Sequence, residues 1–360
     1  MQKKKVLFLH TELAGYFLAC VDALINICDL EVHIVRLPIN AEAPFQFNFN
    51  EKIKFYDRWN QSDKELIKLC KNISPDFIFC AGWVDKCYLE ICQYYYGKIP
   101  TLIVLDNHWT GKLKQRVAVL VAPFYLQNKF SHIWIPGLIQ YEYARKLGFK
   151  KEAILTGMYS ADVPKFYNYY LQYKELKQRS FPRRFLYLGR YVSMKGVDEL
   201  WQAFIELKKE DDNEWELWCA GAGNLEATFP IHPKIKNFGF VQAQAIGDLI
   251  KDTGVLVLPS HYEPWGVVIH ELAACGMPII CSNKVGAASS FLVDGYNGFL
   301  FNANNKDSLK KSMRRIMSLD NEALQKMSAR SLELSNTNNP LIWATKIWEL
   351  IGTFNRDSLA

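Results

Sequence analysis

The sequence predicts an α/β protein built from two doubly wound, Rossmann-like domains. Short apolar segments alternate with amphipathic ones in two successive series, residues 1–160 and 183–336. With 360 residues, 49% of them hydrophobic, the chain can bury the cores of two medium-sized domains. Residues 161–182 are rich in tyrosine and lysine, and we expect this segment to connect the domains.

Buried strands of a parallel sheet are short and continuously apolar, and helices show a period near 3.6 residues. In the first series these patterns predict strands at residues 5–10, 31–37, 76–80, 101–105, 131–136 and 153–158, and helices at 16–28, 62–70, 84–96, 112–121 and 141–147. In the second series they predict strands at 185–188, 215–219, 235–238, 254–259 and 279–281, and helices at 196–208, 244–251, 267–275, 307–317, 322–334 and 341–354. We expect a hairpin or loop at 294–298.

Residues 38–60 combine alternating aromatic side chains with the cations Lys52, Lys54 and Arg58. One interpretation is an edge strand with its connection, which the alternation favours. The other is an aromatic and basic rim that meets a membrane or an acceptor molecule. The sequence leaves both open.

The positive charge is concentrated in the first half of the chain. Residues 1–155 contain 20 Lys and Arg against 15 Asp and Glu, which is +5 of the total +6. This excess suits peripheral contact with an anionic membrane, although a basic soluble surface explains it equally well. The nine cysteines lie mostly in apolar segments, none with zinc-like spacing, and no apolar run reaches 18 residues. We therefore expect a cytoplasmic protein, peripheral at the inner membrane face, without a spanning helix.

The most informative stretch is Ser260–Leu272, which follows the apolar segment 254–259. Pro264 and Gly266 end the strand, and a helix is predicted to start at Val267. Glu263 lies in the loop and Glu271 in the helix, with seven residues between them. Carboxylates accept hydrogen bonds from hydroxyls, and a helix N-terminus favours an anion. Such a unit can hold a sugar, a ribose and a phosphate.

A second motif pairs two cations at the end of a predicted strand. Arg190 follows Gly189, and Lys195 precedes the helix predicted from Gly196. A guanidinium fork and an ammonium charge together suit a diphosphate, whereas a lysine at a helix N-terminus opposes the helix dipole.

Together, Glu263, Glu271 and the Gly-Arg…Lys-Gly pair resemble the signature of the retaining GT-B glycosyltransferases of family 4. The resemblance is motif-specific over residues 185–300 and rests on the order of elements elsewhere. It implies two facing Rossmann-like domains: an acceptor-side domain at 1–160 and a donor domain at 183–336. It also implies that the last helix, within 337–360, returns to the first domain.

The resemblance also implies roles for individual residues. Arg190 and Lys195 would bind the diphosphate, Glu271 the ribose hydroxyls, and Glu263 the hydroxyls of the donor sugar. His108, after the strand at 101–105, would reach the donor as a catalytic residue. Further donor-binding positions are expected at Trp265, Gly266, Val267, Gly15, Gly221 and Val241. The family's tight Gly-Gly pair after the first strand is missing, and Gly15 alone stands there. His270 is expected to pack or orient, and His261 to lie on the surface.

The function that follows is a hexosyltransferase that moves a sugar from a UDP- or GDP-sugar to a glycan or lipid-linked acceptor, in cell-surface polysaccharide synthesis. We expect no metal and no cofactor, since the nucleotide-sugar is a substrate, and no nucleic-acid partner. Two alternatives stay open, a GT-B nucleotide-sugar epimerase and a non-catalytic nucleotide-sugar binding protein. The first would carry an extra carboxylate set for elimination, and the second a degraded donor site.

Overall fold

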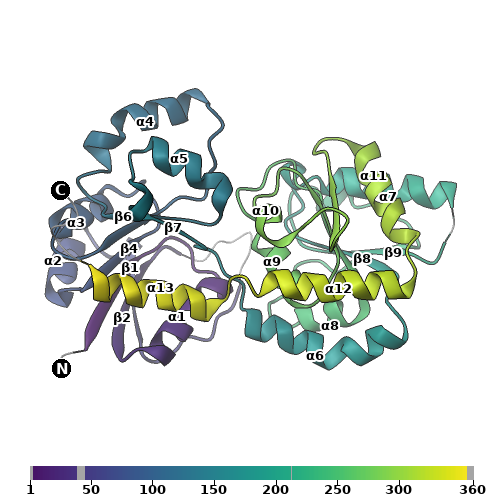
Figure 1. The fold of residues 1–360 in the computed structure, drawn as a ribbon, viewed down its shortest axis with the longest axis horizontal. Coiled ribbons are helices and arrows are strands. Elements are labelled where there is room, and N and C mark those ends of the chain that lie inside the picture. The colour runs from purple at the N-terminus through teal and green to yellow at the C-terminus, as the bar shows by residue number, and fades with distance from the viewer. Residues whose placement is uncertain (1–2, 39–44, 212, 355–360) are drawn as a thin grey trace. The chain divides into compact units, whose positions relative to one another are not determined.

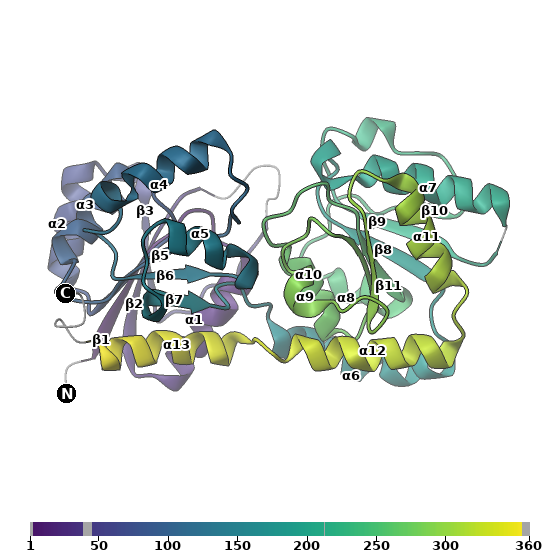
Figure 2. The same cartoon turned by 45° about the horizontal axis from the view of Figure 1, so that its top comes forward.

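The computed structural model describes residues 3–38, 45–211 and 213–354 and divides the chain into two units. The first unit comprises Met1–Ser160 and Asn338–Ala360, and the second comprises Ala161–Thr337. Each unit contains one β-sheet with helices on both of its faces (Figures 1 and 2). The prediction of two Rossmann-like α/β domains is confirmed.

The first unit contains a seven-stranded sheet in the order β3-β2-β1-β4-β5-β6-β7, and each neighbouring pair is parallel. Its strands are β1 (Lys4–Leu9), β2 (Leu30–Arg36), β3 (Ile53–Asp57), β4 (Phe77–Cys80), β5 (Thr101–Val104), β6 (His132–Ile135) and β7 (Ile154–Thr156). Its α-helices are α1 (Gly15–Ile27), α2 (Asp63–Ile73), α3 (Lys86–Tyr95), α4 (Leu113–Tyr125), α5 (Tyr141–Lys146) and α13 (Pro340–Thr353), with 3₁₀ turns η1 (Arg58–Asn60), η2 (Leu138–Gln140) and η3 (Lys151–Ala153). Because both faces are covered, the central strand β4 is buried and apolar throughout, as is the segment Val6–Leu9 of β1.

The second unit contains a six-stranded sheet in the order β10-β9-β8-β11-β12-β13, also parallel throughout. Its strands are β8 (Arg184–Leu188), β9 (Glu216–Ala220), β10 (Ile235–Asn237), β11 (Val255–Leu258), β12 (Ile279–Ser282) and β13 (Gly298–Phe301). Its helices are α6 (Val163–Arg179), α7 (Val197–Glu210), α8 (Ile246–Asp252), α9 (Val267–Ala274), α10 (Ala288–Phe291), α11 (Lys306–Met317) and α12 (Asn321–Ser335), with 3₁₀ turns η4 (Ser193–Lys195) and η5 (Glu226–Thr228).

The segment 161–182, predicted as a connection, instead belongs to the second unit and forms helix α6 there. The Asp162 side chain caps this helix by accepting from the Lys165 N–H at 3.3 Å, and Pro164 occupies its first turn. An aspartate followed two residues later by proline is a helix-start signal that the interpretation overlooked. Phe166 of this helix is buried and Tyr169 and Tyr170 are half-buried, so these aromatic residues belong to the second unit and do not mark a linker.

The strand β13 was not predicted, because a hairpin or loop was expected around it. It pairs with β12 as the edge strand of the second sheet. Gly298 makes this pairing possible, since a Cβ at this position would lie 1.8 Å from the Ile279 carbonyl oxygen.

The C-terminal helix α13 packs beside α1 in the first unit (Figure 1), as predicted. Its Trp343 is fully buried and stacks on Trp134 with ring centroids 5.1 Å apart. The Trp343 indole N–H also donates to the Met158 carbonyl at 2.9 Å. One face of the first sheet therefore takes part of its core from the far end of the sequence.

The aromatic and basic stretch around residue 50 forms the edge strand β3 and the connection before it. Residues 39–44 of this stretch lie outside the described part of the chain. The ring centroids of Phe49 and Phe55 are 4.5 Å apart. The Arg36 Cζ lies over both rings, 5.2 Å from the centroid of Phe49 and 5.1 Å from that of Phe55. Lys54 pairs with Glu31.

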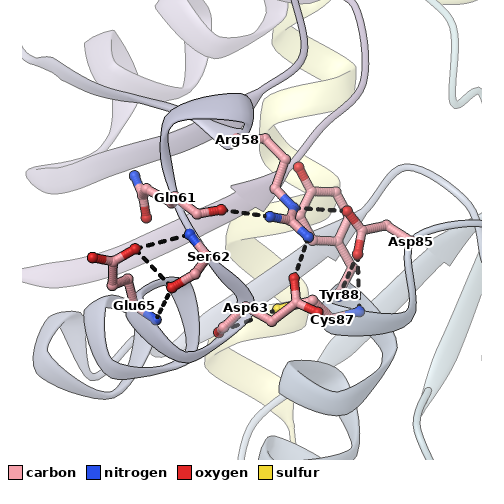
Figure 3. Close-up of polar contacts among 8 residues, drawn as sticks. All are labelled: Arg58, Gln61, Ser62, Asp63, Glu65, Asp85, Cys87 and Tyr88. Atoms are coloured by element: carbon pink, nitrogen blue, oxygen red, sulfur yellow. Dashed lines mark hydrogen bonds and ion pairs between the residues drawn. The ribbon is translucent and has the colours of Figure 1, made fainter.

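Arg58 also serves the fold and is no surface cation (Figure 3). Its guanidinium donates to Asp85 at 2.8 Å, to Asp63 at 2.5 Å and to the Gln61 carbonyl at 2.9 Å. Asp85 in turn caps helix α3, where it accepts from the Cys87 N–H at 2.9 Å. Arg58 thus ties η1 to the starts of α2 and α3. Two of the three cations of the stretch are therefore neutralised internally, which argues against a basic rim there.

Among the residues that the structure describes, every helix is too short or too polar to cross a membrane. All nine cysteines are buried thiols.

Candidate functional site

The predicted donor residues converge at the point where the order of the second sheet reverses. This reversal lies between β8 and β11, which are neighbours although the strands β9 and β10 come between them in the sequence. Ligands of doubly wound sheets bind at such a point, outside the carboxyl ends of the strands. The loop after β8 carries Arg190 and Lys195, and the loop after β11 carries Glu263. The topology therefore brings these two motifs together.

Lys195 and Glu263 form an ion pair between the lysine Nζ and the carboxylate Oε2. The pair is mostly buried, with Ser260 Oγ 3.4 Å from the same carboxylate oxygen. The close approach depends on Gly196, whose φ is 63° and where a Cβ would lie 2.3 Å from the Pro259 carbonyl oxygen. Lys195 thus has a carboxylate partner within the second unit itself.

The Arg190 side chain is exposed on the same loop, and a hydrogen bond from a buried side chain holds its backbone. The buried Tyr187 hydroxyl donates to the Arg190 carbonyl at 2.7 Å. Burial raises the pKa of Tyr187 well above its usual range, so this hydroxyl keeps its proton. The loop backbone is therefore fixed.

Gly221 positions the loops and does not itself present a ligand group. A Cβ on Gly221 would lie 1.8 Å from the Gly189 carbonyl oxygen, so the backbones after β8 and β9 can touch only if this residue is glycine. The Gly221 N–H donates to the Gly239 carbonyl at 2.7 Å. This bond connects the loop after β9 to the loop after β10, which carries the half-buried Val241.

Helix α9 begins directly behind Glu263. Gly266 caps it with a φ of 93°, and a Cβ there would lie 3.0 Å from Glu263 Cγ. Val267 is the first residue of the helix, so its N–H has no acceptor one turn earlier in the helix, whereas the Ile269 N–H donates to the Gly266 carbonyl at 3.0 Å. The Trp265 side chain is buried and packs against Phe291 at 6.3 Å. The Trp265 side chain therefore belongs to the core, and its place as a donor-binding position stays a prediction.

Glu271 has an environment that the sequence did not show. Burial raises the pKa of Glu271 to about 7, and nearby Asp162 adds to the shift while Lys165 opposes it. The Lys165 ammonium also donates to the Ala243 carbonyl at 3.1 Å, in the segment before α8. Glu271 is thus surrounded by the start of α6 and by the loop that also holds Val241. Lys165 and Asp162 were missed because 161–182 was taken for a connection.

His270, next to Glu271, is buried in a fixed orientation. Its Nδ1 accepts from the Ala161 N–H at 3.0 Å, and its Nε2 lies 2.8 Å from the Ser335 carbonyl, to which it donates. The ring also stacks on Phe291 at 3.9 Å. The two hydrogen bonds require the neutral ring with its proton on Nε2. His270 orients α9 against the first and last segments of the second unit.

His261 is not a surface residue, contrary to expectation. Its Nε2 lies 3.2 Å from the Glu199 carboxylate on α7, and both side chains are largely buried. The pair joins the loop after β11 to α7, because Gly196 brings these segments together.

The first unit has a cavity of about 220 Å³ at the equivalent reversal, between β1 and β4. His10 supplies an imidazole and Glu12 and Asp106 supply carboxyl groups, and no Lys or Arg is among its described lining residues. The aromatic lining consists of Tyr16, Phe17, Phe79, Tyr159 and Trp343. Burial lowers the pKa of His10 to about 4, so the imidazole is neutral at physiological pH. The cavity is therefore neutral to acidic.

His10 was not singled out from the sequence, because it ends a strand and shows no motif. Gly15 and His108 are placed near this cavity without lining it. Gly15 is the first residue of α1, and His108 follows the lining residue Asp106 by two positions. The His108 backbone is held by Gln115, whose Nε2 donates to its carbonyl at 2.7 Å.

Two all-parallel Rossmann-like units, with polar residues at each reversal of strand order, define the GT-B class of fold, and solved structures agree. The chain is similar to a glycosyltransferase from Rickettsia africae, with a TM-score of 0.73 and 12% identity over 98% of both chains. It is also similar to HepE of Anabaena in complex with UDP and glucose, with a TM-score of 0.70 and 15% identity over 98% of this chain and 100% of the other. At these identities the likeness shows the fold.

Sequence comparison narrows the similarity to one family. Residues 172–333 match the model of the family described as glycosyl transferases group 1. An uncharacterized glycosyltransferase of Methanocaldococcus jannaschii is 31% identical over 153 residues, which are 39% of each chain. The chain thus spans well under half of the length of this relative. A lipopolysaccharide 1,6-galactosyltransferase of Salmonella typhimurium is 22% identical over 263 residues, 69% of this chain and 67% of that protein.

Proposed function

We propose that the chain is a retaining, family 4 hexosyltransferase that moves a sugar from a UDP- or GDP-sugar to a glycan or lipid-linked acceptor in cell-surface polysaccharide synthesis. The observation that carries the proposal is the Lys195–Glu263 pair at the reversal of the second sheet, with Arg190 on the adjoining loop. The match to group 1 glycosyl transferases and the similarity to a lipopolysaccharide galactosyltransferase support it.

In this proposal the donor binds by exchanging partners with the ion pair. The diphosphate draws Lys195 away from Glu263, and the carboxylate is then released to accept hydrogen bonds from hydroxyls of the donor sugar. Arg190 and the free N–H groups at the start of α9 add positive potential where the leaving diphosphate develops charge. A separate metal ion is not needed for this role.

Glu271 binds the ribose in its ionised form, since only a carboxylate accepts from both ribose hydroxyls. The nucleotide base lies along the loop that carries Val241. A hydrogen bond from the Gly221 N–H holds the backbone of this loop at Gly239. His108 is a catalytic residue in this proposal, and attack from the face of the departing phosphate retains the anomeric configuration.

The cavity of the first unit binds the acceptor sugar. Its volume of about 220 Å³ is below the roughly 300–1,000 Å³ of sites for drug-sized molecules, so it suits a single ring. Aromatic faces pack against the apolar side of a sugar, and Glu12 and Asp106 accept from its hydroxyls. Because the lining is neutral to acidic, the ring that binds is uncharged, and any phosphate of the acceptor lies outside.

The test is a thermal-shift screen of UDP-, GDP- and ADP-sugars, followed by detection of released nucleoside diphosphate. We expect one donor class to stabilise the protein and Lys195→Met to remove most of that stabilisation. Lys209→Met, at an exposed position near the end of α7, is the matched control and should behave as the wild type. No stabilisation by any nucleotide-sugar would refute the proposal.

The same experiment separates the alternatives. An epimerase would invert a centre of the donor sugar without an acceptor, which NMR of the recovered nucleotide-sugar detects. A non-catalytic protein would bind the donor and release no diphosphate with any glycan or lipid-linked sugar offered. Retention of the anomeric configuration in the transfer product, read from NMR coupling constants, is the expected result. We also infer a reducing, cytoplasmic environment, which suits the nine buried thiols.

A further inference from the structure

Helix α4 (Leu113–Tyr125) lies at the periphery of the first unit (Figures 1 and 2) and carries an exposed apolar stripe. Leu113, Leu120 and Phe124 are 76%, 74% and 82% exposed, and Val117 and Val121 are also exposed. These five residues follow the spacing i, i+4, i+7, i+8, i+11 and therefore share one face. Only Ala122 of this helix is buried, on the opposite face. A helix that buries its small residues and exposes its large apolar ones has the orientation of an interface.

The charges around the stripe are all of one sign. At about 100° per residue, Lys114 and Arg116 lie on either side of it, and Lys112 precedes the helix. No Asp or Glu occurs anywhere in residues 107–141. An apolar face flanked by cations is the pattern of helices that lie in the interface of an anionic bilayer.

We propose that α4 docks the first unit onto an anionic lipid surface, with the stripe among the acyl chains and the flanking cations at the headgroup phosphates. A second copy of the chain fits this face poorly, because pairing two such stripes brings cations against cations with no acidic partner in the segment. This inference stands apart from the proposed reaction, since it concerns a different surface.

Docking of α4 also sets where the cavity of the first unit lies. The Thr110 N–H and hydroxyl donate to the Gln115 side chain at 2.7 and 2.9 Å, and Gln115 donates to the His108 carbonyl. These bonds tie the first turn of α4 to the loop that begins at Asp106, a lining residue of the cavity. When α4 is bound to lipid, the edge of the cavity at Asp106 is therefore only seven positions along the chain from the first residue of the docked helix.

The test is co-sedimentation of the full chain with phosphatidylglycerol–phosphatidylcholine vesicles and with pure phosphatidylcholine vesicles. We expect binding to the anionic vesicles that weakens as salt is added. Leu120→Gln should lower the partition about tenfold or more, because it removes a leucine from the acyl region. Leu176→Gln, the same change at a 58% exposed position on α6, is the matched control and should have no effect.

Lys114→Gln should lower the partition about fivefold at low salt and less at high salt. Equal binding by all variants, or no binding of the wild type to anionic vesicles at low salt, would overturn the proposal. Self-association in sedimentation velocity that Leu120→Gln abolishes would also overturn it, because a second copy would then cover the stripe.

Discussion

Nucleotide binding should depend on the titration of Glu271, because its pKa lies near neutrality. The carboxyl has a pKa of about 7 through burial, reinforced by Asp162 and opposed by Lys165. The proposed ribose contact needs the ionised form. About a tenth of the groups are ionised at pH 6 and about nine tenths at pH 8. The Glu271-dependent part of nucleotide affinity should therefore rise about tenfold between these values.

The assay is isothermal titration of UDP or GDP, whichever binds, at intervals from pH 6 to 8. The diphosphate itself titrates in this range, so Glu271→Gln serves as the matched control for the ligand. The wild type should gain affinity relative to this variant as pH rises. Parallel pH profiles for the two proteins would refute the reasoning, since the titrating group would not be Glu271.

A second variant changes the pKa instead of removing the group. Lys165 stabilises the ionised carboxylate, so Lys165→Met should raise the pKa of Glu271 and move the rise in affinity to higher pH.

The free energy of unfolding of the ligand-free wild type should depend on pH with the opposite sign to the nucleotide affinity. The carboxyl is protonated in the folded state up to about pH 7 but ionises near pH 4.5 when unfolded, so its contribution to stability falls as pH rises between these values.

Three further outcomes are expected. Lys195→Ala and Arg190→Ala should each weaken nucleoside diphosphate binding about 10- to 100-fold, from roughly 1.5–3 kcal/mol per charge-assisted hydrogen bond, without lowering the melting temperature greatly; unchanged affinity in both would show that neither binds the phosphates. Transfer activity should survive EDTA, and an inactive enzyme rescued by magnesium or manganese would contradict this. Trp343→Ala should lower the free energy of unfolding by about 3–5 kcal/mol in urea denaturation, and a loss below 1 kcal/mol would argue against its place in the core.

The residues at the reversal of the second sheet could be predicted because topology alone brings them together. In a parallel sheet the loops after neighbouring strands share an edge, so Lys195 and Glu263 needed only correct strands to become neighbours. Their ion pair was not predictable, because Lys195 was expected to bind the diphosphate and Glu263 the donor sugar. The distance between them depends on Gly196 lying against Pro259, a packing detail without a sequence pattern.

The environment of Glu271 could not be predicted for another reason. It depends on α6, and a tyrosine-rich segment without obvious amphipathic order was taken for a connection. The capping aspartate and the proline of its first turn were the available signals. His10 gave no signal at all, because a histidine at the end of a strand becomes part of a cavity only when α1 and α13 close over it.

The discontinuity of the first unit has a consequence for the order of folding during synthesis. Residues 161–337 form one continuous unit and can fold as soon as they leave the ribosome. The residues before them leave the ribosome earlier but lack α13 and its Trp343, which stacks on Trp134 and on Phe8 of the first strand. The domain that is translated first is therefore completed last. Until then its central aromatic residues are packed incompletely, and chaperones can protect them from aggregation.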